Sequence, residues 1–132
     1  VKAAIGEKGL TDWVFWQKKA PQYQMKGVYQ QADFFLLPTE YEIFGMVLLE
    51  TMFFRRVVLT TPNGGADMLL RSGENGLVLE KSDPARWAKT LLDIAADPEK
   101  KARMEQAAYE TVIHENTWDA LADRFLAVYE KR

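Results

Sequence analysis

Two glutamates, Glu42 and Glu50, lie eight positions apart in the stretch PTEYEIFGMVLLETMFF, residues 38–54. The apolar run within this stretch predicts a helix that begins near Phe44 and Gly45, with Glu50 as its one charged residue. A helix that is apolar nearly all round is buried, and a buried carboxylate is costly unless something pairs with it. The positions three and four residues away are all apolar, so the same helix supplies no partner. Either a distant part of the fold or a ligand must therefore satisfy Glu50.

The predicted helix start between the two glutamates is a place where an anion can bind. The first backbone N–H groups of a helix have no partner within it and lie at the positive end of the helix dipole, which favours a phosphate. Gly45 allows a ligand to approach this backbone closely. The preceding loop is polar and holds Thr39, Glu40 and Tyr41 as well as Glu42. This loop is our leading candidate for a ligand site.

The expected separation of the two glutamates indicates which ligand they could hold. With Glu42 just before the helix and Glu50 two turns inside it, the axial offset is about 10 to 12 Å, and somewhat less between the carboxyl groups. Two carboxylates that act on one glycosidic bond lie roughly 5 to 9.5 Å apart, which disfavours a hydrolase pair. The pattern favours contacts at both ends of one long ligand, with a diphosphate on the amides between them. A nucleotide-sugar has this form, with its ribose at Glu50 and its sugar at Glu42.

Apolar runs separated by helical patterns predict the elements that position this loop. Strands are expected at residues 34–37 (FFLL), 57–61 (VVLTT) and 76–80 (GLVLE), and WVFW at 13–16 is taken as a further strand. Apolar strands that alternate with helices form a parallel sheet covered by helices on both faces. Ligands bind outside the carboxyl ends of such strands, which selects the loops at 17–22, 38–43 and 61–66. We therefore predict a single α/β domain with a Rossmann-like parallel sheet and a helical C-terminus.

Helix start and stop signals predict the remaining elements. A first helix ends at Gly9, and an Asp-Pro pair marks a helix start at Asp83 and again at Asp97. The expected helices cover residues 1–9, 23–31, 44–54 and 66–71, then run from 84, from 98 to 115, and from 116 or 117 onward. The side chains predicted to pack in the core are Trp13 and Trp16, then Trp87, Leu91, Leu92 and Ile94, and in the last helix Trp118, Leu121, Phe125, Leu126 and Tyr129.

The composition sets the class of protein and excludes several kinds of site. The chain has 132 residues, 48% of them hydrophobic, and a net charge of -2, so it suits one folded domain and offers no general basic surface for nucleic acid. It has no cysteine and a single histidine, His114, which excludes a thiolate or ordinary zinc site. No apolar run approaches the ~20 residues of a membrane-spanning helix. The absence of an initial Met leads us to expect a piece of a longer chain.

Together with TTPNGG at 60–65, ENGLVLE at 74–80 and the late Thr117 and Trp118, the 38–54 stretch resembles the group 1 retaining glycosyltransferases of GT-B fold. The resemblance covers essentially the whole chain as the latter part of their C-terminal, donor-binding domain. It implies that residues 1–132 are one nucleotide-sugar-binding domain, truncated on its N-terminal side, with no metal and no cofactor beyond the nucleotide-sugar substrate. By this resemblance Glu42 is catalytic at the donor sugar, Glu50 binds the ribose, and the other donor contacts fall on Thr39, Phe44, Gly45, Met46, Val47, Gly64 and Gly65.

The family transfers a sugar from a nucleotide-sugar to a carbohydrate, lipid or other acceptor with retention at the anomeric carbon. The resemblance thus implies a hexosyltransferase of carbohydrate biosynthesis. Its partners would be a nucleotide-sugar and an N-terminal acceptor-binding domain of the same parent chain, and not nucleic acid. We expect no transmembrane segment and a cytoplasmic setting, with any membrane contact peripheral and made through the missing domain. Without that domain and the basic Arg and Lys pair of the family, this segment alone should be inactive.

Several positions depart from the family pattern. Ile43 replaces a common glycine, Arg55 and Val57 lie where glycine and proline are common, and Met68 replaces a frequent acidic residue. Arg55 would therefore lose the easy left-handed helix stop that glycine provides. Two other functions stay open, a nucleotide-sugar epimerase of GT-B-like fold and a non-catalytic nucleotide-sugar-binding or assembly module. For Glu50 the alternative is structural, a buried acid paired with a distant Lys or Arg.

Overall fold

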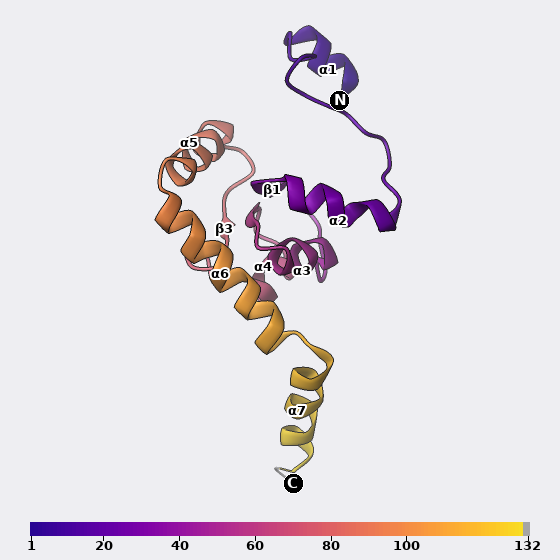
Figure 1. The fold of residues 1–132 in the computed structure, drawn as a ribbon, viewed down its shortest axis with the longest axis vertical. Coiled ribbons are helices and arrows are strands. Elements are labelled where there is room, and N and C mark those ends of the chain that lie inside the picture. The colour runs from indigo at the N-terminus through magenta and orange to yellow at the C-terminus, as the bar shows by residue number, and fades with distance from the viewer. Residues whose placement is uncertain (131–132) are drawn as a thin grey trace.

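The computed structural model describes residues 1–130, which form a parallel α/β fold (Figure 1). The sheet has three strands in the order β1-β2-β3, with Phe34 opposite Val57 and Leu59 opposite Leu77. The predicted α/β class with a parallel sheet is confirmed. The elements are α1 (Lys2–Glu7), α2 (Gln22–Gln31), β1 (Phe34–Leu37), α3 (Met46–Phe53), β2 (Val57–Thr60), α4 (Gly64–Leu69), β3 (Leu77–Val78), α5 (Pro84–Ala95), α6 (Pro98–Glu115) and α7 (Trp118–Tyr129).

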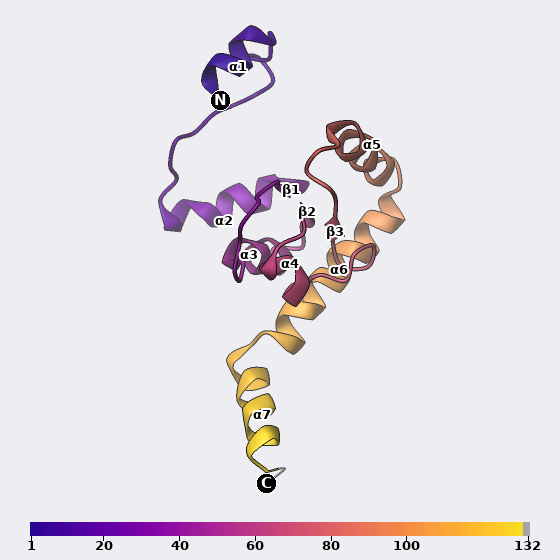
Figure 2. The same ribbon diagram turned by 180° about the vertical axis from the view of Figure 1, so that it is seen from behind.

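Alternation along β2 divides the core into two clusters, one on each face of the sheet. Val57 and Leu59 pack with side chains of α5 and α6, including Trp87 and Ile94. Val58 points to the other face, where α3, α4 and the middle of α6 supply the neighbours. Successive strand residues point to opposite faces, so a fully apolar strand such as β2 needs cover on both sides. Figures 1 and 2 show α2 and α3 beside the strands on one side of the view and α5 on the other, while the long α6 runs past the sheet and packs on α3.

Local capping signals place the helix starts where the sequence predicts them. The side chains of Asp83 and Asp97 each accept a hydrogen bond of 2.9 Å from the backbone N–H three residues later. Thr117 caps α7 in the same way, and Gly9 adopts the predicted left-handed conformation with φ of +63°. Asn63 caps α4, which therefore begins at Gly64 and not at the predicted residue 66. Each of these caps satisfies an N–H group that the helix itself leaves free.

The predicted strand at residues 13–16 does not form, and this expectation is wrong. Trp13 and Phe15 expose 86% and 90% of their surface, and the Lys2 ammonium lies 4.6 Å from the ring centroid of Trp16. A strand needs a neighbour that takes up its backbone hydrogen bonds, and this segment lies away from the sheet with α1 (Figure 1). Residues 13–16 are apolar, but no other element of the described chain packs against them and buries them.

The predicted inward face of the last helix is also wrong. Trp118, Phe125 and Tyr129 expose 88%, 63% and 68% of their surface. The reason is that α7 contacts the described chain chiefly through the end of α6 and then projects away from it (Figure 2). Two smaller corrections concern Leu92 in α5 and Leu36 in the edge strand β1, whose side chains are also exposed because no described element covers them.

Candidate functional site

The predicted ligand loop, residues 38–45, connects the end of β1 to the start of α3. Gly45 lies just before α3 with a left-handed φ of +76°, and a Cβ there would lie 2.8 Å from the side chain of Leu48. A side chain at this position would be strained and would clash, so the turn requires glycine. The helix consequently begins at Met46, one or two residues later than predicted.

Glu42 folds back onto the backbone amides that the sequence predicts as an anion site. Its Oε1 accepts hydrogen bonds from the N–H of Gly45 at 3.0 Å and from the N–H of Phe44 at 3.3 Å. A carboxylate is favourable here because it meets free donors at the positive end of the α3 dipole. A phosphate oxygen that bound these two amides would replace the Glu42 carboxylate.

Glu50 is half-buried, not fully buried as predicted, and its partners come from a distant helix. The hydroxyl of Tyr29 donates to Oε2 at 2.8 Å, and Nε2 of Gln22 donates to Oε1 at 3.2 Å. Both donors lie on α2 and both are neutral, so the Lys or Arg partner that we left open is not used. The Glu50 carboxylate is thus held between the first turn and the far end of α2 by two neutral donors.

Tyr29 is the one tyrosine of the core, with 2% of its surface exposed. Its ring stacks on Phe54 with centroids 5.6 Å apart and lies tilted against Phe35 at 6.1 Å. Burial, followed by the hydrogen bond to Glu50 and the charge of that carboxylate, raises the pKa of the Tyr29 hydroxyl well above its ordinary value. Tyr29 therefore stays protonated across the neutral pH range and donates a hydrogen bond to Glu50.

Gly64 and Gly65 lie directly against the backbone of the 38–45 loop. A Cβ on Gly64 would lie 2.7 Å from the carbonyl oxygen of Ile43, and one on Gly65 would lie 2.7 Å from that of Phe44. The close approach that these glycines permit is thus made by the backbone of the loop itself. Thr61 adds a hydrogen bond from its hydroxyl to the carbonyl oxygen of Thr39. The loops after β1 and β2 consequently form one structure.

The structure brings most of the predicted donor contacts to this edge of the sheet. Met46 is exposed, Val47 is half-buried, and Thr39 bonds through its hydroxyl to the backbone of Tyr41. Glu40 does not join the group, because it forms an ion pair with Lys81, and that hydrogen bond and charge lower the pKa of the Glu40 carboxyl. The predicted roles of these residues stay predictions.

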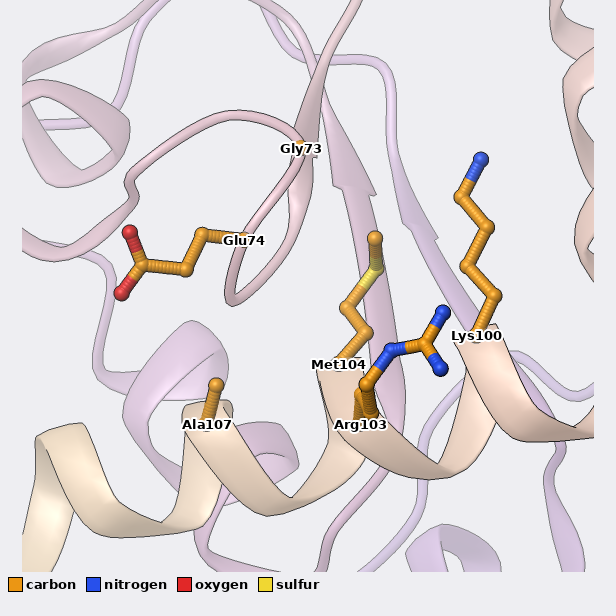
Figure 3. A pocket seen from close by; sticks show the side chains of 6 residues that line it. All are labelled: Gly73, Glu74, Lys100, Arg103, Met104 and Ala107. Atoms are coloured by element: carbon orange, nitrogen blue, oxygen red, sulfur yellow. The ribbon is translucent and has the colours of Figure 1, made fainter.

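Two hollows in the described chain lie at different distances from the candidate site at the carboxyl ends of the strands. One of about 620 Å³ is lined by Lys19, Ala20, Pro21 and Gln22, so it opens beside the side chain that bonds Glu50. The other, of about 410 Å³, lies between the 73–74 loop and α6, with Glu74 directed away from Lys100 and Arg103 (Figure 3). That loop precedes β3, and the strands are parallel, so this second hollow lies at the opposite end of the sheet.

Within residues 1–130 no group of three His, Cys, Asp or Glu side chains is arranged to hold a metal ion. Over the same residues, no helix combines the length and the apolar character needed to cross a membrane.

A sequence profile of the family described as "Glycosyl transferases group 1" matches residues 1–111. The chain belongs to the group 1 glycosyltransferases. D-inositol 3-phosphate glycosyltransferase of Thermomonospora curvata is 33% identical over 125 residues, which cover 93% of this chain and 28% of that protein. The enzyme of the same name from Mycolicibacterium vanbaalenii is also 33% identical, over 126 residues. The chain thus spans under a third of the length of these curated relatives.

Solved structures show the same GT-B fold for this glycosyltransferase chain. Sucrose-phosphate synthase from Thermosynechococcus elongatus superposes with a TM-score of 0.84 at 25% identity, over 98% of this chain and 33% of that one. Anabaena HepE in complex with UDP-glucose gives a TM-score of 0.77 at 21% identity, over 99% of this chain and 36% of that one. The resemblance inferred from the 38–54 stretch is confirmed at the level of family and fold.

In this member of the group 1 glycosyltransferase family, the backbone at Arg55 adopts the helix-stop conformation without glycine. Arg55 adopts a left-handed φ of +55°, so the helix stop forms although its residue type disfavours it. Its guanidinium lies 4.3 Å from the ring centroid of Tyr109 on α6, a favourable cation–π distance. A contact between α3 and α6 therefore offsets backbone strain at this position.

Sequence reasoning missed Tyr29 and Gln22 as partners of Glu50. Tyr29 counts as one more apolar residue in a helix pattern, and Gln22 as part of a polar loop. The usable signal was Glu50 itself, because a carboxylate with no local partner requires donors elsewhere. A tyrosine that ends up buried in a neighbouring helix meets this requirement, since its hydroxyl also needs a partner.

Proposed function

We propose that the chain is the donor-binding part of a retaining hexosyltransferase. It would bind a nucleotide-sugar and work with an acceptor-binding domain of the same longer protein. The observation that carries the proposal is the Glu42 carboxylate on the amides of Phe44 and Gly45, with Glu50 five residues further along, in the second turn of α3. The start of α3 already holds an anionic oxygen, and a diphosphate presents the same chemistry. UDP-glucose in the structural relative HepE supports this class of donor.

The mechanism follows from where charge develops. As the bond between the anomeric carbon and the diphosphate breaks, negative charge grows on the leaving oxygen, and the fixed amides at the start of α3 stabilise it. The acceptor hydroxyl forms the new bond to the anomeric carbon and passes its proton to the departing diphosphate oxygen. Glu42, displaced from the amides by the diphosphate, would face the donor sugar, while Glu50 holds the ribose. No metal is needed in this scheme, since backbone dipoles supply the positive potential.

Donor binding by the intact protein tests the role of Glu50. The substitution Glu50→Gln should raise the Kd for the preferred nucleotide-sugar about 10-fold or more, because a hydrogen bond to a charged group contributes about 1.5–3 kcal/mol. Glu110→Gln, the same change on the exposed face of α6, is the matched control and should leave the Kd unchanged. Equal affinity of the Glu50→Gln protein and the wild type would contradict the proposal.

An acceptor-free incubation with labelled donor distinguishes the neighbouring functions. A transferase gives at most slow hydrolysis, whereas a stereoisomer of the donor would identify an epimerase. Binding with no turnover, even with acceptors supplied, would identify a binding module.

A further inference from the structure

We propose that Tyr29 is a positioning residue that fixes the Glu50 carboxylate, and that Gln22 is the group replaced when a donor hydroxyl binds there. The inference rests on the proposed function, in which Glu50 accepts hydrogen bonds from the ribose of the donor. It adds that the two oxygens of the Glu50 carboxylate have different roles. Oε2 is held by the protein, and Oε1 is kept available for the ligand.

The Tyr29 side of the carboxylate is rigid. Tyr29 is almost fully buried, and its ring is held by the stacked Phe54 and the tilted Phe35. Because both rings belong to the sheet and the α3 side of the core, the hydroxyl has little freedom to move. Its bond of 2.8 Å to Oε2 therefore sets the rotation of the Glu50 carboxyl group.

The Gln22 side is loose by comparison. Gln22 is the first residue of α2, its side chain is exposed, and its bond to Oε1 has a length of 3.2 Å. It also lines the hollow of about 620 Å³ that opens at the start of α2. A hydroxyl group entering from this hollow could take the place of the Gln22 amide at Oε1 at small cost, because the amide returns to water.

The charge of the partners fits this role. A Lys or Arg would bring a positive charge to Glu50, whereas Tyr29 and Gln22 are neutral hydrogen-bond donors. A carboxylate offers about four acceptor positions, and one of them is used by Tyr29. The remaining positions suit the two neighbouring hydroxyls of a ribose and are underused by a 2′-deoxyribose. Fixing the carboxylate thus gives discrimination between ribonucleotide and deoxyribonucleotide donors.

The test uses Tyr29→Phe in the intact protein, which removes the hydroxyl and keeps the buried ring. The probes are UDP, ADP and GDP with their 2′-deoxy counterparts, and the matched control is Tyr109→Phe on α6. We expect Tyr29→Phe to raise the Kd of the tightest-binding ribonucleotide about 5- to 10-fold. Its ratio of ribonucleotide to deoxyribonucleotide affinity should fall toward that of Glu50→Gln. In the Tyr29→Phe and Glu50→Gln double variant, the two losses should not add.

A second variant keeps the inference testable if Tyr29→Phe fails to fold. Gln22→Ala changes an exposed side chain, and we expect it to bind the nucleotide as tightly as the wild type or a few-fold tighter, with the ribose preference kept. A loss as large as that of Glu50→Gln would show that Gln22 itself holds the donor and would overturn its assigned role.

The affinities of these variants test the positioning role of Tyr29 separately from the proposed donor binding. If Glu50→Gln weakens binding while a folded Tyr29→Phe protein keeps wild-type affinity and discrimination, the positioning role is wrong and the proposed function stands. If the wild type binds none of the probes, or Glu50→Gln binds as the wild type does, the proposed function fails as well.

Discussion

At the scale of single residues, Arg55 shows how side-chain contacts hold an unfavourable backbone angle. A left-handed conformation costs about 1–2 kcal/mol for a residue other than glycine, and an exposed cation–π contact returns about 0.5–1 kcal/mol. Arg55→Ala keeps the strain and loses the contact with Tyr109, whereas Arg55→Gly removes both. We expect the alanine variant to be less stable than the glycine variant by about 1 kcal/mol in urea unfolding. Equal stability of the two variants would show that φ at this position relaxes.

Asp33 gives a prediction about pH. Its hydrogen bond to Lys101 and the charge of that lysine lower the pKa of the Asp33 carboxyl below its ordinary value of 3.8. A lowered pKa in the folded state stabilises the fold above the unfolded-state value, and this stabilisation disappears as the pH falls through the folded-state value. Asp33→Asn should therefore unfold at lower urea concentration than the wild type at pH 7. At a pH below both values the two midpoints should coincide, and a difference that persists there would contradict the ion-pair explanation.

At the scale of elements, a buried amide connects the 71–76 turn to α6. Asn75 is fully buried, accepts from the N–H of Arg71 at 2.7 Å, and donates to Leu69 and to the hydroxyl of Thr111. Asn75→Ala takes this partner away from the N–H of Arg71 and from the carbonyl oxygen of Leu69, whereas the Thr111 hydroxyl keeps its bonds to Arg71 and Ala107. We expect a loss of about 2–3 kcal/mol in the free energy of unfolding, because buried backbone groups lose a hydrogen bond. Asn116→Ala, which removes one bond to a less buried site, should cost under about 1 kcal/mol. A smaller loss for Asn75→Ala than for this control would rule out the network as a support of the turn.

Elements with local signals could be predicted from the sequence, and elements that depend on neighbours could not. The helices at Asp83 and Asp97 were recognisable because the cap, the proline and the first turn lie within a few residues. Residues 13–16 and α7 have equally clear apolar patterns, yet both are exposed, since a pattern does not state which surface will cover it. The candidate site divides in the same way. The loop and Glu50 are visible in the sequence, whereas Tyr29 is placed by the packing of α2 on α3 and β1.

At the scale of the whole molecule, apolar side chains gather at both extremities of the described chain. Trp13 and Phe15, in the segment after α1, and Trp118 and Phe125, on α7, are exposed. Figure 1 shows α1 and α7 at the two ends of the molecule. Exposed apolar patches of this kind promote association. We expect residues 1–132 alone to self-associate at micromolar concentrations in sedimentation velocity.

Paired substitutions test which side chains cause this association. The variant Trp13→Ser with Phe15→Ser should shift the distribution toward monomer and leave the unfolding midpoint unchanged, because these side chains contribute nothing to the core. Met68→Ser, which removes an isolated exposed side chain on α4, is the control and should change neither quantity. A monomeric wild-type chain would contradict the prediction.

The 38–45 loop packs on Gly64 and Gly65, and this contact affects the order of folding on the ribosome. The loop leaves the exit tunnel first, but the backbone that supports Ile43 and Phe44 follows only with the turn after β2. Until that turn has emerged and β2 has paired with β1, only the local hydrogen bonds of Glu42 to the amides of Phe44 and Gly45 hold the start of α3. The candidate ligand edge is therefore completed in co-translational folding only after the turn that follows β2 has emerged, although the 38–45 loop emerges before it.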